Sequence, residues 1–338
     1  MSVQAGEQAR GSQRKGVSLR FSQEGIVFLL TMLMFVGFSI LLPNFLTSGN
    51  VIALMRSVSV LGMLALGMSL VVIGRGVDLT MVSTLVVGVV WAVKMANDGM
   101  PFGQALFYGG LLVAGFGMVV GLIVAFAEIP PIFTTLAMAP VIFGIGNPFL
   151  FKQDTHNAPQ GVTWLNELGF GASFGIPNTI LVFAAVALVM HLILRYTRFG
   201  RSIYAMGDNP AAARLSGLPV RPITVAQYMM TALVAYLVGI VILGSNSGIN
   251  SRLAYTTLVY DVLLVVVLGG IGLSGGRGGV RNVIVGTLFV GTLLSGMTIL
   301  NLSLTAQNFI KSLVMLLALI ADTVANPRDE QTSQQGDI

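Results

Sequence analysis

The sequence predicts an all-α membrane protein, a polytopic bundle of about ten transmembrane helices. Of its 338 residues, 55% are hydrophobic and only 9% are charged, whereas soluble domains carry about 25% charged residues. The mean hydropathy is +0.87. Because too few polar residues remain to cover a surface in contact with water, a soluble globular fold is excluded, and membrane lipid is the expected surrounding.

Apolar runs bounded by proline, glycine, asparagine or charge place the helices, since crossing the hydrocarbon layer takes about 20 apolar residues. The ten predicted spans are residues 26–42, 51–73, 79–96, 102–127, 130–150, 177–195, 222–244, 256–273, 280–300 and 304–324. The second, fifth and eighth have the weakest patterns. We expect one membrane domain over residues 25–325, with polar tails at 1–24 and 326–338. No small-residue cleavage site follows the first run, so we expect an uncleaved helix rather than a signal peptide.

Basic residues predict the orientation, because short loops rich in Lys and Arg remain on the cytoplasmic side. With the N-terminus inside, most of the 18 Lys and Arg residues fall in cytoplasmic segments. An even number of spans then makes both termini cytoplasmic. The net charge of +5 reflects this topology rather than a basic stripe along one helix, so no nucleic-acid partner is expected.

Two loops are long. Residues 151–175 carry few basic residues and are predicted to face outward, as a cap or docking surface. Residues 196–221 are rich in arginine and are predicted to be cytoplasmic.

The centre of the cytoplasmic loop predicts a short helix. Asp208 or Asn209 can cap it, Pro210 suits its first turn, and Gly217 followed by Pro219 ends it.

Glycine in the apolar runs favours close helix packing, as in the Gly117 and Gly121 step. A short internal similarity also relates residues 71–80 (VVIGRGVDLT) to 272–281 (GLSGGRGGVR). Both are glycine-arginine turns that close an apolar run at the predicted cytoplasmic side. Transporters are often built from repeated halves, although chance explains so short a match equally well.

Catalytic groups do not converge in this sequence. The two histidines, His156 and His191, fall in the outer loop and near the cytoplasmic end of the sixth span, so they are not expected to share a metal. The chain has no cysteine and no phosphate-binding G-x-x-x-x-G-K-[ST] motif. We therefore expect no enzyme activity, no metal site and no cofactor in this chain. If ATP and Mg²⁺ drive transport, another chain binds them.

Only two charged residues, Asp261 and Lys311, fall well inside predicted spans, which disfavours an ion-driven mechanism. Neutral polar and aromatic side chains in the spans suit a polyhydroxylated solute. The same groups also suit hydrogen bonds between helices. The candidate residues of a substrate pathway are Phe133, Thr134, Thr135, Asn147, Asn246 and Asp261.

Four segments resemble the membrane subunits of ribose-type, monosaccharide-importing bacterial ABC transporters. They are FGRSIYAMGDNPAAARLSGLPV at 199–220, VVIGRGVDLT at 71–80, PPIFTTLAM at 130–138 and VLGGIGLSGGRGGVRNVIVGTLFVGTL at 267–293. The resemblance extends over residues 45–322. Arg75, Asp208, Arg281 and Asn282 depart from the small residues usual at these positions.

The resemblance implies a multi-pass permease of the bacterial inner membrane that imports a monosaccharide or related polyol. Its implied partners are a periplasmic solute-binding protein, cytoplasmic ABC ATPase subunits that use ATP and Mg²⁺, and a second permease subunit, identical or similar. The small-residue helix would be the coupling element that rests on the ATPase. The residues expected at this ATPase contact are Gly207, Asn209, Ala212, Ala213, Arg214 and Gly217.

Other functions stay open from the residues alone. An ABC permease for a branched-chain amino acid or a signalling sugar would share the fold. An ion-coupled secondary transporter would need an intramembrane ion site and no ATPase. A membrane scaffold without transport has no sequence feature in its favour.

Overall fold

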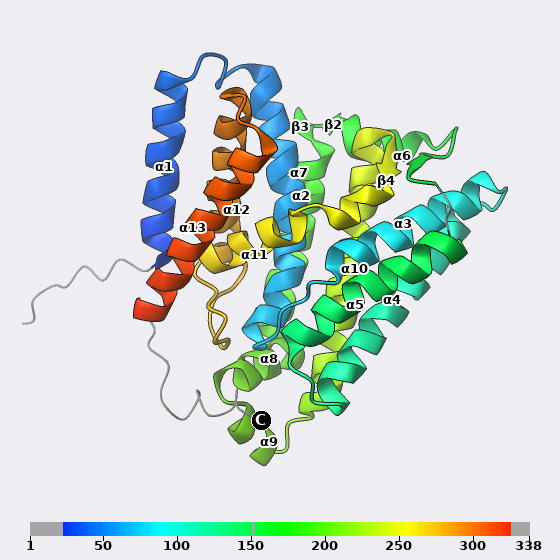
Figure 1. Ribbon diagram of the computed structural model, residues 1–338, viewed down its shortest axis with the longest axis vertical. Coiled ribbons are helices and arrows are strands. Elements are labelled where there is room, and N and C mark those ends of the chain that lie inside the picture. The colour runs from blue at the N-terminus through cyan, green and yellow to red at the C-terminus, as the bar shows by residue number, and fades with distance from the viewer. Residues whose placement is uncertain (1–22, 151–152, 326–338) are drawn as a thin grey trace, which may run out of the picture.

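The computed structural model describes residues 23–150 and 153–325, so most of both predicted tails lies outside the described residues. These residues form a helical bundle with four very short strands (Figure 1). The helices are α1 (Gln23–Leu41), α2 (Ser48–Ile73), α3 (Met81–Asn97), α4 (Phe102–Phe126), α5 (Pro131–Ile145), α6 (Thr163–Phe170), α7 (Asn178–Tyr196), α8 (Arg198–Asp208), α9 (Pro210–Leu215), α10 (Val220–Asn246), α11 (Leu258–Leu268), α12 (Val280–Ile299) and α13 (Leu304–Ala325). The strands are β1 (Thr155–Asn157), β2 (Ala172–Ser173), β3 (Ile176–Pro177) and β4 (Gly248–Asn250).

An apolar helix occupies each of the ten predicted span positions. Among the described residues, eight helices are long and apolar enough to cross a membrane, which confirms the predicted polytopic all-α fold. The fifth span continues from α5 into a π-helical turn, Gly146–Leu150. The third and eighth, α3 and α11, are shorter, with 17 and 11 residues.

The eighth predicted span, 256–273, is wrong as a continuous helix. Helix α11 stops at Leu268, and Gly270 adopts a left-handed backbone with φ of +91°. An irregular segment then leads to α12. Such non-helical backbone is tolerated at membrane depth where other protein groups satisfy its hydrogen bonds. Here Asn282 Nδ2 donates to the carbonyl of Gly269 at 2.7 Å, and Gln23 Nε2 donates to that of Val267 at 3.2 Å. Hydropathy alone did not reveal this break, because the glycine-rich run is apolar as well.

Helices α2, α3 and α10 form the centre of the bundle, and most residues of α3 are buried. Helix α4 packs directly on α10 through the predicted glycine step. A Cβ on Gly117 would lie 2.7 Å from the carbonyl oxygen of Tyr228, and one on Gly121 would lie 2.7 Å from the Cα of Val225. Small residues therefore let these two backbones approach closely, as lipid-embedded helices require.

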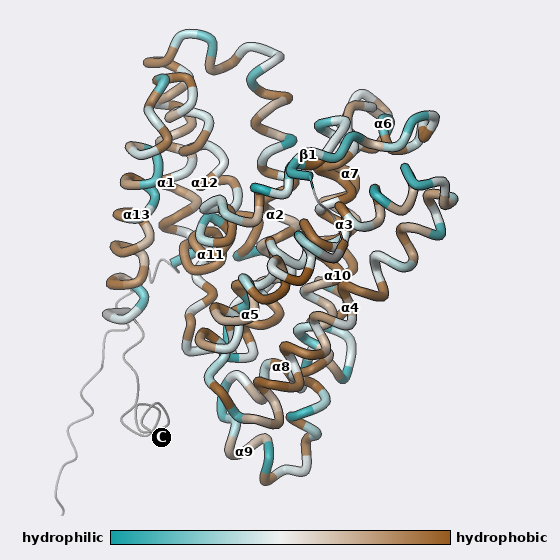
Figure 2. Tube along the Cα trace, turned by 45° about the vertical axis from the view of Figure 1, so that its right-hand side comes forward, coloured by the Kyte–Doolittle hydropathy of each residue, from teal (hydrophilic) through white to brown (hydrophobic). Residues whose placement is uncertain are grey.

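Helices α1 and α13 flank the centre and expose apolar side chains. Leu33, Ile40 and Leu316 are 62%, 77% and 54% exposed. Figure 2 shows hydrophobic residues along these outer helices and hydrophilic ones mainly at the ends of the bundle. Such a surface suits contact with lipid rather than with water.

The start of α1 and the end of α13 lie toward the end of the bundle that carries α8 and α9, which we call the inner end (Figure 1). Glu24 on α1 forms an ion pair with Arg281 on α12 there. A Cβ on Gly272 would lie 3.1 Å from the carboxylate of Asp322 on α13. Both described chain ends therefore lie on the side of the predicted coupling loop.

Candidate functional site

The inner end carries two helices where the sequence predicted one. Helix α8 follows α7 after Thr197, whose Oγ1 accepts a hydrogen bond from the Gly200 N–H at 3.0 Å. The predicted short helix is α9, and its cap is Asn209 rather than Asp208. Asn209 Oδ1 accepts from the Ala212 N–H at 3.0 Å. Asp208 instead ends α8, so the Asn209 cap separates the two helices.

Local sequence explains both ends of α9. Pro210 occupies its first turn, where a missing N–H costs nothing. After Leu215 the chain turns through Gly217, whose φ of +80° favours glycine. The N–H of Leu218 then bonds to the carbonyl of Ala213 at 3.1 Å and closes the helix.

The six residues expected at the ATPase contact fall into two groups. Asn209, Ala212, Arg214 and Gly217 are exposed at the inner end, whereas Gly207 and Ala213 are buried. A Cβ on Gly207 would lie 1.9 Å from the carbonyl oxygen of Ile73 and 2.5 Å from the nitrogen of Gly276. In this structure Gly207 therefore packs α8 against the body, and the exposed four form the accessible face.

The two similar glycine-arginine turns meet at this place. The Gly276 N–H donates to the carbonyl of Ile73 at 2.8 Å, which joins residues 272–281 to 71–80. Arg75, which the sequence marked only as an unusual residue, donates from its guanidinium to carbonyls at the end of α8. Its position in a glycine-flanked turn was the one sequence signal for a structural role. Its hydrogen-bond partners could not be predicted, because they lie more than a hundred residues away in the chain.

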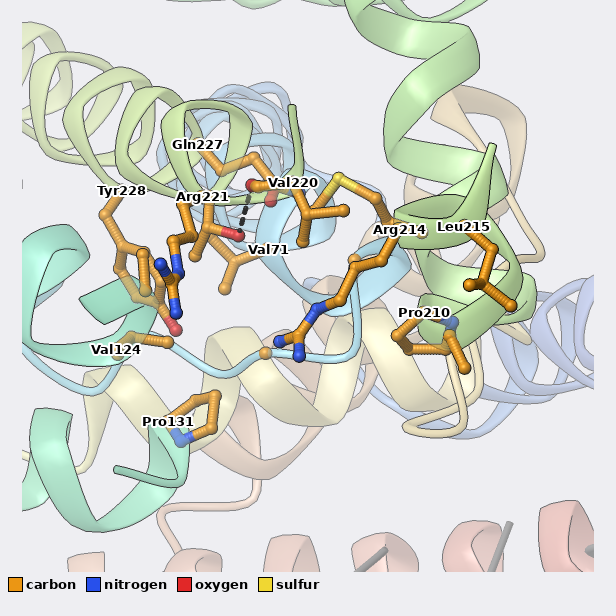
Figure 3. A pocket seen from close by; sticks show the side chains of 16 residues that line it. Val71, Val124, Pro131, Pro210, Arg214, Leu215, Val220, Arg221, Gln227 and Tyr228 are labelled. Atoms are coloured by element: carbon orange, nitrogen blue, oxygen red, sulfur yellow. Dashed lines mark hydrogen bonds between the residues drawn. The ribbon is translucent and has the colours of Figure 1, made fainter. Parts of the chain in front are cut away.

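A cavity of about 670 Å³ separates α9 from the inner ends of α2, α4 and α10. In Figure 3, Arg214 and Arg221 extend into it below Gln227, with Tyr228 beside Arg221. Gln227 Nε2 donates to the carbonyl of Leu70 at 2.7 Å and so fixes one wall. Space on one side of α9 leaves room for that helix to shift relative to the bundle.

Glu128, between α4 and α5, links this cavity to α9 and α10. Its carboxylate lies 3.0 Å from the Arg221 guanidinium and 4.0 Å from that of Arg214. The hydrogen bond from Arg221 and the nearby charge of Arg214 lower the pKa of Glu128. The group therefore stays ionised at neutral pH and attracts both arginines.

The six candidate pathway residues are distributed over four elements, α5, the π-helical turn, the end of α10 and α11. Thr134 and Thr135 are buried at the start of α5, and Thr135 Oγ1 donates to backbone carbonyls of Val77 at 3.2 Å and Pro131 at 2.9 Å. Phe133 beside them is 65% exposed. These threonines act here in helix packing.

Three further candidates lie elsewhere in the bundle. Asn147 is exposed on the π-helical turn, and Asn246 is exposed as the last residue of α10. Asp261 on α11 forms an ion pair with Lys311 of α13, with the nitrogen 2.7 Å from the nearer oxygen. A small cavity of about 60 Å³ adjoins this pair.

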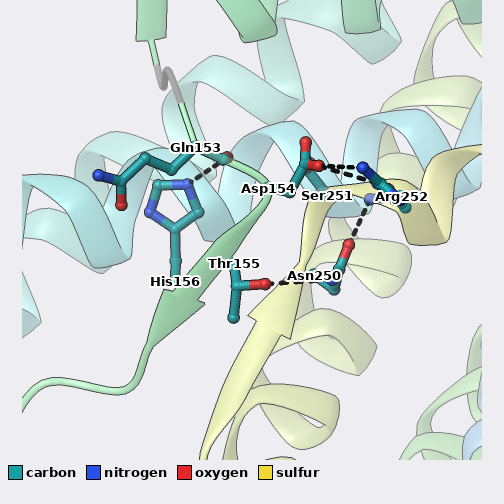
Figure 4. Close-up of polar contacts among 7 residues, drawn as sticks. All are labelled: Gln153, Asp154, Thr155, His156, Asn250, Ser251 and Arg252. Carbon is teal, nitrogen blue, oxygen red and sulfur yellow. Dashed lines mark hydrogen bonds and ion pairs between the residues drawn. The ribbon is translucent and has the colours of Figure 1, made fainter.

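The opposite, outer end carries a folded cap where the sequence predicted a loop. Strand β1 pairs antiparallel with β4, with His156 opposite Ile249. Figure 4 shows the side chains that join the two segments. The carboxylate of Asp154 lies 2.8 Å from the guanidinium of Arg252. The backbone carbonyl of Asp154 accepts a hydrogen bond from the Ser251 N–H at 2.6 Å.

Helix α6 packs on α10 beside these strands. A Cβ on Gly169 would lie 2.1 Å from the backbone of Gly244, so the two chains touch directly. The cap is therefore attached to the same long helix, α10, that starts beside α9.

Metal ligation has no support among the residues that the structure describes, where no three His, Cys, Asp or Glu side chains gather. His156 Nε2 lies 2.9 Å from the carbonyl oxygen of Gln153, within the cap. His191 is on α7, far along the chain.

A bundle of apolar helices, with a small exposed helix at one end and a folded cap at the other, defines a polytopic membrane protein. Residues 50–319 match the family described as "Branched-chain amino acid transport system / permease component". The match covers most of the chain, and the chain belongs to this family of bacterial inner-membrane transport permeases.

Curated relatives match over nearly their whole lengths. The ribose import permease protein RbsC of Escherichia coli strain K12 is 32% identical over 303 residues, which cover 89% of this chain and 93% of the relative. RbsC of Bacillus subtilis strain 168 is 31% identical, covering 87% and 91%. The L-arabinose transport system permease protein AraH of Escherichia coli strain K12 is 30% identical, covering 89% and 90%. No solved structure matches the chain significantly.

Proposed function

We propose that this chain is the membrane-spanning permease subunit of an ATP-driven ABC importer for a monosaccharide or related polyol. The solute would arrive from a periplasmic binding protein at the outer cap. Cytoplasmic ATPase subunits, which hold the ATP and Mg²⁺, would contact α9. The chain itself would have no ATPase activity and would work with a second, identical or similar permease subunit.

The observation that carries this proposal is the exposed face of α9, made of Asn209, Ala212, Arg214 and Gly217. A short, well-capped helix of small residues can seat in a groove of a partner and transmit a push as a rigid unit. Gly207 packs the preceding helix α8 against the bundle, and Glu128 attracts Arg214 of α9. A displacement of α9 would therefore be transmitted to the bundle.

The relatives favour a sugar over the open alternatives. The similar permeases are named for ribose and L-arabinose, both pentoses, although the family description names branched-chain amino acids. An ion-coupled mechanism would use ionisable side chains within the membrane to bind the ion, and in this structure the Asp261 and Lys311 side chains bind each other.

The test uses the exposed residue of the alanine run. Ala212→Glu places a bulky charge on the outer face of α9, while Ala213 is buried and would disturb packing instead. We expect the variant to fold, to lose at least about tenfold in ATPase affinity, and to stop ATP-driven uptake in reconstituted vesicles. Affinity is measured by co-purification with the ATPase subunit.

Ala172→Glu is the matched control, because Ala172 is also exposed but lies at the outer end. It should retain ATPase association. Unchanged association in Ala212→Glu would refute the coupling assignment. Uptake driven by a proton or sodium gradient through the chain alone would refute the assignment as an ABC importer. Uptake of leucine instead of pentoses would refute the assignment of a sugar as the substrate.

A further inference from the structure

The last turn of α8 lies against the end of α2 without any side chain between them. Gly207 provides this contact, since even a methyl group would overlap the Ile73 carbonyl. The carbonyls of Gly207 and Asp208 are at the C-terminus of α8, where helix carbonyls lack intrahelical partners and carry partial negative charge. Asn209 follows immediately and caps α9, so a displacement of α9 displaces these two carbonyls.

Arg75 binds both of these carbonyls. Its Nε donates to the Gly207 oxygen at 2.6 Å and its Nη2 donates to the Asp208 oxygen at 2.6 Å. Charge-assisted hydrogen bonds from a planar guanidinium fix both distance and direction. The backbone of Arg75 is left-handed, with φ of +67°, a conformation that glycine adopts without strain. Arginine at this position therefore carries a conformational cost that glycine would avoid.

The loop that carries Arg75, residues 74–80, reaches three spanning helices. The Val77 carbonyl accepts from Thr135 Oγ1 of α5 at 3.2 Å and from Tyr228 Oη of α10 at 3.4 Å. Within the loop, Asp78 Oδ1 accepts from the N–H of Thr80 at 2.9 Å, and the chain continues directly into α3 at Met81. The loop is thus a junction between the end of α8 and the inner ends of α3, α5 and α10.

We propose that Arg75 is a positioning residue that transmits movement of the α8–α9 unit to the 74–80 loop, and through Val77 to α5. This inference rests on the proposed function, because the movement would come from the ATPase at α9. The other link of α9 to α5, through Glu128, joins side chains that are more than half exposed and is screened by water and salt. Arg75 provides the direct, partly buried connection.

The test is the ratio of solute imported to ATP hydrolysed, measured with the complete complex in vesicles. Arg75→Gly removes the guanidinium and relieves the left-handed backbone, so folding and ATPase association should be retained. We expect ATP hydrolysis to continue while the ratio falls by at least about tenfold, because the variant loses both charge-assisted hydrogen bonds of Arg75. Arg75→Lys keeps the charge without the two-pronged geometry and should give an intermediate ratio.

Asn44→Gly is the matched backbone control. Asn44 has nearly the same conformation, with φ of +69°, in the loop between α1 and α2 at the outer end. Its ratio should equal that of the wild type.

Two results would overturn the inference. One is an unchanged ratio in Arg75→Gly. The other is a parallel loss of hydrolysis and uptake with less folded complex, which would show a purely structural role. A wild-type complex that imports no solute with ATP would overturn the proposed function itself, so the two failures are distinguishable.

Discussion

At the scale of single residues, the two charges that the sequence placed inside spans bind each other. Lys311 Nζ lies 2.7 Å and 2.9 Å from the two oxygens of Asp261 and 3.3 Å from Thr257 Oγ1. The two side chains are 10% and 13% exposed. A charge in an apolar span is costly unless it is paired, so this pair fixes α13 against the short helix α11.

We predict that Lys311→Met destabilises the permease by about 3 kcal/mol, because it leaves the carboxylate buried and unpaired. The double variant Asp261→Leu with Lys311→Met should recover most of this loss. The measurement is thermal unfolding of the purified protein in detergent. Lys94→Met serves as control, since its partner Asp98 and Lys94 itself are 61% and 43% exposed. Equal effects of Lys311→Met and Lys94→Met would contradict the prediction.

At the scale of elements, α8 decides how the coupling region is held. Its sequence resembles a surface segment, with three exposed arginines at or near its start, Arg195, Arg198 and Arg201. Yet Gly200, Ile203, Met206 and Gly207 form a buried side that packs on the bundle. Helix α8 therefore packs directly on the bundle, and this packing depends on the absence of a side chain at Gly207.

Gly207→Ala should force α8 away from the end of α2. The added Cβ would lie 1.9 Å from the Ile73 carbonyl oxygen, and overpacking against backbone costs about 1–3 kcal/mol. We expect a lower unfolding temperature and a lower yield of folded protein. Gly144→Ala in α5 is the control, because nothing lies within 4 Å of its added Cβ. A Gly207→Ala protein as stable as Gly144→Ala would show that α8 moves away easily.

At the scale of the whole molecule, the two ends of the bundle differ in kind. The inner end presents α9, with a cavity beside it, and the outer end presents the cap of α6 and the β1–β4 pair (Figures 1 and 4). Helix α10 runs between them, from Val220 beside α9 to Asn246 beside the cap. One continuous helix, α10, thus connects the two ends of the bundle.

The predicted orientation is testable because the chain contains no cysteine. Phe174→Cys replaces an outer residue that is 98% exposed, and Leu215→Cys replaces an α9 residue that is 90% exposed. A membrane-impermeant maleimide should label Phe174→Cys in intact cells, or in spheroplasts where an outer membrane is present. Leu215→Cys should be labelled only after the membrane is permeabilised. The reverse pattern would place α9 outside and end the proposal of a cytoplasmic ATPase contact.

The sequence by itself determined the features that depend on local chemistry. Hydropathy over about 20 residues fixed the membrane class and the positions of the apolar helices, because each helix must satisfy its own backbone in lipid. The Pro210 start and the Gly217 turn of α9 were also predicted, with Asp208 or Asn209 as the cap, since caps involve neighbours three residues apart.

Only the tertiary structure decided which distant segments meet. The break after Leu268, the burial of Gly207, the β1–β4 pairing and the contacts of Arg75 with the end of α8 all depend on residues far apart in the chain. The candidate pathway residues were chosen as polar or aromatic side chains within the spans, and in the structure they lie on four different elements. Hydropathy is a property of one segment, whereas packing depends on which surfaces fit together, and a single sequence records the first directly and the second only through its folded state.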